Sequence, residues 1–281
     1  MPSPRSALSR ALLGLAVLGA LVASRPAVAL GTEPDGREAQ RSGSSRTLPG
    51  YDISYPQCGG TFPKDPAFAI VGVNGGRVYS VNPCLGAGNG PSELAWGGRS
   101  TELYANTGNP GPELSSFWPD GQSYPRPCNT SEVPGRDTHD CAYDYGWNAA
   151  KHSYATAVAA YISLGWAEEG ATRTPVDNHW WLDVETSNSW RDEVSLNVAT
   201  LRGAVDYLES VGVASVGFYS TGYQWGVITG GTRTFADHAS WVAGARTLQG
   251  ARRNCTATGF TGGAVVYTQY FANGFDADYR C

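Results

Sequence analysis

The chain has 281 residues, with 20 Lys and Arg, 25 Asp and Glu, and a net charge of −5. An acidic protein whose arginines are scattered favours neither nucleic acid nor an anionic membrane as a partner. The 9 Trp, 15 Tyr and 36 Gly residues are typical of a loop-rich protein that binds sugars through aromatic rings. The alternative is that most of these rings fill the core.

Residues 1–29 have the three parts of a secretory signal peptide. Two arginines precede a 13-residue apolar run at 11–23, and Ala27-Val28-Ala29 fits the small-x-small cleavage pattern. An uncleaved anchor would need about 20 apolar residues, and Arg25 interrupts this one. We therefore expect cleavage near residue 29, no membrane segment afterwards, and a mature protein that is extracellular or associated with the cell wall.

The segment 30–48 is polar and rich in Gly and Ser, so it is predicted to be a disordered linker. The remainder, 49–281, has a length that suits one β/α barrel and contains no internal linker or repeat. We expect this part to be a single domain and a monomer.

All six cysteines lie in the domain, and an even number in an oxidising compartment indicates three disulfides. Six cysteines allow 15 connectivities, of which the pairing of sequence neighbours is the simplest: Cys58 with Cys84, Cys128 with Cys141, and Cys255 with Cys281. There is no C-x-x-C motif and the histidines are dispersed, so we expect no metal site and no cofactor.

Short apolar runs that are typical of buried parallel strands recur along the domain, at 50–54, 68–73, 102–106, 180–185, 215–219, 239–243 and 264–270. Helical spacing of apolar residues predicts one helix from Tyr143 to Glu168 and another from a Ser195 N-cap to Gly212. This alternation predicts an α/β fold, a single irregular TIM-like β/α barrel. An open doubly wound sheet is the alternative, but no Gly-rich phosphate loop follows its first strand.

After the third strand, residues 107–141 form a long Pro- and Gly-rich segment that contains Cys128 and ends at Cys141. Long loops in compact domains are usually functional or disordered. We expect a disulfide-stapled insertion that forms a wall beside the active face.

The strongest chemical signal is the pair Asp183 and Glu185 at the end of the apolar run 180–185. Residues two apart on a strand project to one side, about 6.6 Å apart, and barrel enzymes place catalytic groups at the C-terminal ends of strands. Neighbouring carboxylates repel, so one can stay protonated while the other is ionised. Glycoside hydrolysis needs this division, although D-x-E pairs also occur by chance on surfaces.

Two more acids occupy comparable positions, Asp52 in the first strand and Asp276 in the last strand region. The first and last strands of a closed barrel are neighbours and the fourth faces them, so all four carboxylates are predicted to converge on one cleft. The alternatives are that Asp52 caps a loop and that Asp276 is a solvated terminal residue.

Four aromatic residues near strand ends are candidate sugar platforms, with core packing as the alternative: Tyr219, Trp225, Trp241 and Tyr270. Ser/His/Asp catalysis finds no support, because there is no G-x-S-x-G elbow. His179 precedes the fourth strand and is interpreted as structural.

In their order along the chain, these segments resemble glycoside hydrolase family 25, the lysozyme-type N-acetylmuramidases, in a divergent actinobacterial branch. The resemblance implies an irregular β/α barrel that cleaves the glycan of peptidoglycan. It implies Glu185 as general acid and Asp183 as an assisting group that steers the substrate's acetamido group, with Asp52 and Asp276 completing the cleft. The matching pieces are 51–54, 68–76, 181–185, 218–220, 267–270 and 275–276.

The chain also departs from this family. Tyr55-Pro56-Gln57-Cys58 replaces the family's tryptophan after the first strand, and the third-strand region lacks the usual Tyr-His-Phe. The carboxylates therefore favour a cell-wall glycosidase more strongly than they favour muramidase specificity. The alternatives are a glycosidase for a different cell-envelope glycan, and a catalytically inactive barrel that binds cell-wall polysaccharide. Retention of four mutually repelling acids favours the enzyme.

Overall fold

The structure is a computed structural model that describes residues 49–128, 136–167 and 174–281. The expected signal peptide and the expected linker up to residue 48 lie outside these residues. Glu168, the predicted end of the first long helix, also lies outside them, but that prediction is wrong because the helix already ends at Ser163. In the described part, no helix combines the length and the apolar character needed to cross a membrane. The same residues contain no group of three or more His, Cys, Asp or Glu side chains that could hold a metal ion.

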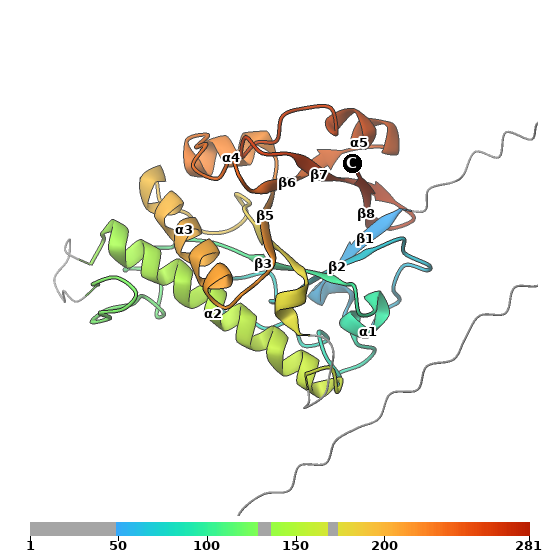
Figure 1. Cartoon of the computed structure of the whole chain (residues 1–281), viewed down its shortest axis with the longest axis horizontal. Helices are drawn as coiled ribbons and strands as arrows, with labels where there is room; N and C mark the ends of the chain where they lie inside the picture. Colours follow the sequence, from blue (N-terminus) through green and yellow to red (C-terminus); the bar gives the residue numbers. More distant parts are fainter. Residues whose placement is uncertain (1–48, 129–135, 168–173) are drawn as a thin grey trace, which may run out of the picture. The chain divides into compact units, whose positions relative to one another are not determined.

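Eight strands close into a barrel in chain order (Figure 1). Strands β1 to β7 pair in parallel, whereas β8 runs antiparallel to both β7 and β1. The predicted single irregular β/α barrel is thus confirmed over the open sheet. The strands are β1 Gly50–Ile53, β2 Ala69–Gly72, β3 Glu102–Asn106, β4 His179–Asp183, β5 Ser215–Ser220, β6 Ala239–Ala245, β7 Val265–Ala272 and β8 Phe275–Arg280.

Helices cover the outside of the barrel: α1 Glu93–Gly97, α2 His139–Ser163, α3 Val194–Ser210, α4 Gly222–Thr229 and α5 Leu248–Asn254. Helix α2 begins four residues before the predicted start, because the Thr138 hydroxyl accepts a hydrogen bond from the Cys141 amide and caps the helix there. The predicted N-cap Ser195 is wrong: the side chain of Glu193 caps α3, and Ser195 lies in its first turn.

Helices α2 and α3 lie side by side against one flank of the barrel (Figure 1). Their close approach requires glycine, since a Cβ at Gly146 would lie 1.9 Å from the Thr200 carbonyl oxygen and one at Gly203 would lie 2.0 Å from that of Tyr143. Between these helices and the sheet lies the main hydrophobic core, which includes Leu103, Trp180, Leu182, Leu201 and Phe218.

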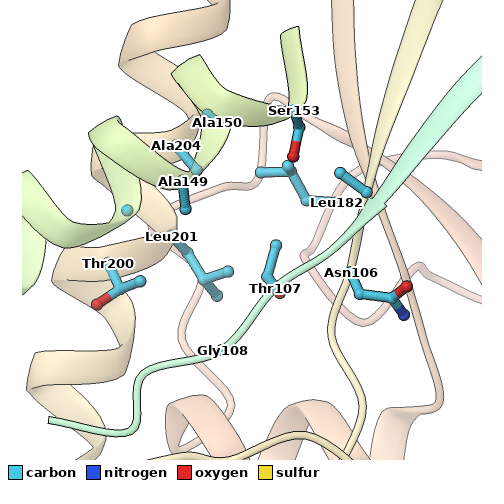
Figure 2. A pocket seen from close by; sticks show the side chains of 12 residues that line it. Asn106, Thr107, Gly108, Ala149, Ala150, Ser153, Leu182, Thr200, Leu201 and Ala204 are labelled. Atoms are coloured by element: carbon cyan, nitrogen blue, oxygen red, sulfur yellow. The ribbon is translucent and has the colours of Figure 1, made fainter. Parts of the chain in front are cut away.

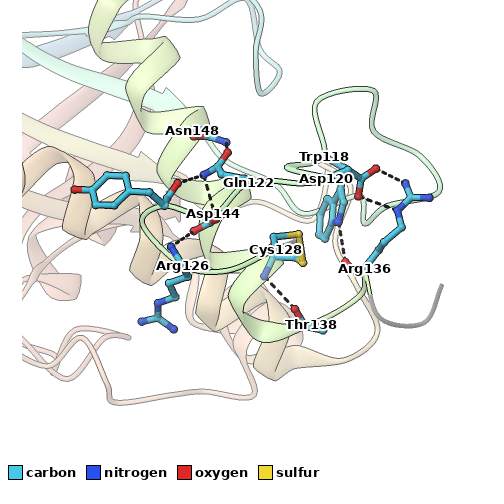
Figure 3. The surroundings of a disulfide bond; sticks show 11 residues. Trp118, Asp120, Gln122, Arg126, Cys128, Arg136, Thr138, Asp144 and Asn148 are labelled. Carbon is cyan, nitrogen blue, oxygen red and sulfur yellow. Dashed lines mark hydrogen bonds and ion pairs between the residues drawn. A yellow bond between two sulfur atoms is a disulfide. The ribbon is translucent and has the colours of Figure 1, made fainter. Parts of the chain in front are cut away.

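All three disulfides join sequence neighbours as predicted, Cys58–Cys84, Cys128–Cys141 and Cys255–Cys281. The second anchors the insertion after β3 to the start of α2 (Figure 3). Buried Asp144 on α2 adds a second anchor, because its carboxylate accepts hydrogen bonds from the Arg126 amide at 3.0 Å and from Gln122 Nε2 at 3.1 Å. The insertion is therefore a structured part of the domain where the structure describes it.

A two-residue turn, Asn273–Gly274, joins β7 to β8. Both residues have positive φ, 57° and 86°, as type I′ hairpin turns require. The turn pairs Ala272 with Phe275 and sets the register of β8, which brings Asp276 opposite Asp52 of β1. Because β8 is antiparallel, its beginning lies at the same end of the barrel as the C-terminal ends of the other strands.

Candidate active site

A cavity of about 380 Å³ opens at the C-terminal ends of the parallel strands. All four carboxylates predicted from the sequence line it, and the lining as a whole comes from seven strands and from loops that follow strands. The lining residues are Asp52, Ser54, Tyr55, Gly76, Arg77, Tyr104, Asn106, Asp183, Glu185, Ser187, Asn188, Tyr219, Trp241, Gln269 and Asp276.

Asp183 is the last residue of β4 and is only 3% exposed. The side-chain amide of Asn106, its register partner at the end of β3, donates a hydrogen bond to Oδ2. The other oxygen, Oδ1, is buried without a hydrogen-bond partner. Burial, followed by the charges of Glu185 and Asp52, raises the pKa of Asp183 well above its usual range.

Glu185 lies two residues beyond the end of β4, not within the strand as predicted. Its carboxylate is partly exposed and accepts a long hydrogen bond of 3.5 Å from Gln224 Nε2 of α4. Its backbone carbonyl accepts a 2.8 Å bond from Trp190 Nε1, which holds the loop after the strand. The pair thus shares one cavity, with Asp183 enclosed and Glu185 open to solvent.

Asp52 belongs to a hydrogen-bonded chain across the barrel interior. The Tyr219 hydroxyl donates to Gln269 Oε1 at 2.8 Å, and Gln269 Nε2 donates to Asp52 Oδ2 at 3.0 Å. Burial raises the pKa of Asp52 to about 7, with the charge of Asp276 as the next cause.

Strand β8 contributes two acids. Asp276 lies at the exposed rim, where partial desolvation raises its pKa. Asp278 lies deeper, is fully buried and accepts a 2.7 Å hydrogen bond from Trp241 Nε1. Burial and the charge of Asp52 raise its pKa well above the usual range. The sequence analysis missed Asp278, although residues two apart on a strand share a face.

The structure brings two of the four predicted aromatic platforms to the cavity. Tyr219 and Trp241 line it, with ring centroids 4.5 Å apart. Trp225 does not, because it is 1% exposed and packs into the core behind β5. Tyr270 also does not, because its side chain is buried outside the barrel with Tyr51. For both residues the alternative of core packing holds.

Other cavity residues were not singled out as site residues from the sequence. Tyr104, Asn106 and Gln269 project inward from β3 and β7, whereas Tyr55 and Arg77 come from the loops after β1 and β2. Gln269 lies in 267–270, one of the segments that resemble family 25, but no role was predicted for it. A hydrogen bond across the barrel has no signature in the sequence.

A second, apolar pocket lies between α2, α3 and the ends of β3 and β4 (Figure 2). It holds only about 20 Å³, room for about one water. Alanine and leucine side chains dominate its lining and no carboxylate reaches it. We interpret it as a packing gap between the helices and the barrel.

Comparison with known proteins supports the resemblance seen in the sequence. Residues 171–250, which include Asp183 and Glu185, match the family model described as Lysozyme-like protein 1. A stretch of 63 residues is 40% identical to probable GH family 25 lysozyme 4 of Dictyostelium discoideum. This match covers 22% of the chain and 29% of the relative, so the chain spans less than a third of that relative's length. The resemblance to family 25 lysozymes is thereby confirmed.

Three solved structures are similar over 83% of the chain. They are the muramidase of Trichobolus zukalii (17% identity, 93% of that chain, TM-score 0.47), the muramidase of Acremonium alcalophilum (15%, 93%, 0.49) and the bacterial lysozyme of Streptomyces coelicolor (15%, 91%, 0.47). All three TM-scores lie below 0.5.

Proposed function

We propose that this lysozyme-like chain is a secreted glycoside hydrolase that cleaves cell-wall peptidoglycan as a muramidase. The observation that carries the proposal is the convergence of Asp52, Asp183, Glu185 and Asp276 on one cavity at the barrel mouth. A site without chemistry would have no reason to retain mutually repelling, partly desolvated carboxyls. The match over residues 171–250 adds the lysozyme class.

In the first step, Glu185 donates a proton to the glycosidic oxygen from the open side of the cavity. The carbonyl oxygen of the substrate's own acetamido group attacks the anomeric carbon as the glycosidic bond breaks, giving a cyclic oxazolinium ion. Asp183 accepts a hydrogen bond from the acetamido N–H, and Asn106 holds the Asp183 carboxylate in place through Oδ2.

In the second step, water attacks the anomeric carbon and gives its proton to the Glu185 carboxylate. The oxazolinium ring opens, the configuration at the anomeric carbon is retained, and one water is consumed per glycosidic bond. The proton on Glu185 also controls its neighbour, because the charge of Glu185 is one cause of the raised pKa of Asp183. Before the first step Glu185 carries its proton and no charge that opposes ionisation of Asp183, so Asp183 is already an anion when the cation forms beside it. Asp52 and Asp276 add negative potential around it.

The test is hydrolysis of purified cell walls, followed as dye release or clearing in a zymogram. Glu185→Gln should lower the rate at least about a hundredfold, the usual contribution of a general acid. Glu209→Gln, which changes an exposed residue of α3, is the matched control and should keep the wild-type rate. Identification of the new reducing end on defined muropeptides distinguishes a muramidase from other glycosidases.

Two results would contradict the proposal. Equal clearing by wild type and Glu185→Gln would remove Glu185 as the acid. No release by the wild type from any wall or arabinogalactan substrate, with the protein still bound to it, would indicate a polysaccharide-binding barrel.

Export is part of the proposal, and the three disulfides support it because such bonds persist in oxidising compartments. We expect the secreted monomer to begin near Leu30. Mass spectrometry of protein from the culture medium checks this, and a cell-retained chain that keeps its first 29 residues would contradict it.

A further inference from the structure

A second groove of about 440 Å³ continues from the carboxylate cavity. The two share Arg77, Ser187 and Asn188, so a ligand in one can extend into the other without leaving the surface. The far side of the groove is formed by the insertion after β3, through Leu114 and the run 115–117. This wall follows the third-strand region, which is one of the places where the chain departs from the resembled family.

The charge of the groove is opposite to that of the cavity. Among the residues that the structure describes, no carboxylate lines the groove, and Arg77 is the one Lys, Arg or His that does. The Arg77 side chain is exposed and forms none of the ion pairs found among the described residues. A negatively charged group on a substrate would be repelled by the four cavity acids and attracted to Arg77 at the junction.

The insertion adds an apolar platform beside this cation. Phe117 is 54% exposed although one face of its ring stacks on Tyr79, with centroids 4.3 Å apart and planes 7° apart. Leu114 is 79% exposed on the same wall.

Contacts with α2 hold the platform of Phe117 and Leu114 in place. Trp118 stacks on Tyr145 of α2 at 5.2 Å, and Trp118 Nε1 donates to the Arg136 carbonyl at 2.8 Å (Figure 3). The Tyr79 hydroxyl in turn donates to the Tyr145 carbonyl. The exposed rings and side chains are thus fixed relative to the barrel mouth.

We propose that this groove binds the anionic peptide substituent of the glycan. Arg77 pairs with a peptide carboxylate, while Phe117 and Leu114 contact its apolar side chains. The proposal rests on the proposed function and makes it more specific: the substrate is a peptide-bearing glycan and not a bare amino-sugar polymer.

A kinetic test compares peptidoglycan that keeps its peptides with the same strands after an amidase has removed them. Wild type should have the higher kcat/KM on the peptide-bearing form. Arg77→Gln should lower this preference about tenfold, the usual worth of a charge-assisted hydrogen bond, and Phe117→Ala about threefold by loss of apolar contact. Arg253→Gln, an exposed arginine of α5, is the matched control and should keep the wild-type preference.

The readout is the ratio of two rates, so it separates this proposal from the catalytic one. Glu185→Gln should lower both rates alike and leave the ratio unchanged. A ratio that Arg77→Gln does not alter, or a wild-type preference for stripped strands, would overturn the peptide site while hydrolysis itself stands.

A binding test needs no turnover. In an NMR titration, muramyl dipeptide should bind the wild type about tenfold more tightly than its fully amidated, uncharged form, and Arg77→Gln should abolish this difference. Equal binding of the two forms by the wild type would overturn the proposal even if no substrate is hydrolysed.

Discussion

Carboxylates lie at both ends of the barrel interior, half-buried at the base and buried at the mouth, and their hydrogen bonding differs between the two ends. At the base, both oxygens of Glu102 are satisfied: the Tyr267 hydroxyl donates at 2.6 Å and Trp181 Nε1 at 2.7 Å, and Arg280 supplies a positive charge nearby. At the mouth, Asp183 has one oxygen without a partner and acids as neighbours. We expect the satisfied acid at the base to stabilise the fold, and the acids at the mouth to serve the proposed hydrolysis.

The largest expected effect comes from the mouth. Asp183→Asn should lower wall hydrolysis about a hundred- to thousandfold, in the range of lost transition-state electrostatics. The free energy of unfolding should stay constant or rise, because the amide has no charge to desolvate. Dye release and urea denaturation measure the two quantities. A variant that is less stable but equally active would reverse the comparison.

At the base we expect the reverse, a loss of stability with little change in activity. Glu102→Ala leaves the Trp181 and Tyr267 donors unpaired and should lower the free energy of unfolding by about 3 kcal/mol. The kcat of the remaining folded protein should change less than twofold, because Glu102 does not line the cavity. Urea denaturation and kcat per folded molecule test this. A large fall in kcat with normal stability would place Glu102 in the site.

The pH dependence of stability sharpens the contrast at Asp52. Its pKa is about 7 in the fold against an ordinary value of 3.8, so the folded state binds more protons and stability falls as pH rises. From pH 5 to pH 7 the contribution lost should be about 2 kcal/mol. Asp52→Asn should make this slope shallower, while Asp183 and Asp278, whose pKa is also raised, keep part of it; urea denaturation across the pH range measures the change. An unchanged slope would exclude Asp52 as its source.

A smaller effect is expected at Asp144, a buried acid that is satisfied by the insertion. Asp144→Ala should lower the free energy of unfolding by about 1 kcal/mol, the net worth of a typical hydrogen bond. The loosened segment should also be cut sooner in limited proteolysis, which mass spectrometry locates. Cleavage elsewhere first would show that the disulfide alone holds the insertion.

The sequence predicted the barrel well because buried parallel strands read as continuous apolar runs. The segment 102–106 coincides with β3, and the other predicted strands differ from the observed ones by a few residues at most. The ends of the strands are predicted less well, because a strand ends where its pairing with the neighbouring strand ends, and a single sequence does not show that pairing. Strand β4 ends at Asp183 although the pattern runs on to Glu185.

Side-chain direction explains the remaining differences at the site. Gln269 and Tyr270 are adjacent on β7, so one faces the lumen and the other packs outside. Proximity to a strand end alone did not distinguish them. Trp225 lies on α4, whose two turns are too few for periodicity to reveal which face is buried. The role of Asn106 depends on register with β4, which a single sequence does not contain.

The Asn273–Gly274 turn has a consequence for how the acidic mouth can change in evolution. Strand side chains alternate between faces, so a one-residue insertion at this turn would rotate Asp276 and Asp278 out of the lumen together. A two-residue insertion would return both to it. The two carboxyls of β8 therefore face the lumen or leave it together. Which of the two happens depends on whether an odd or an even number of residues is inserted in a turn whose own two residues do not line the cavity.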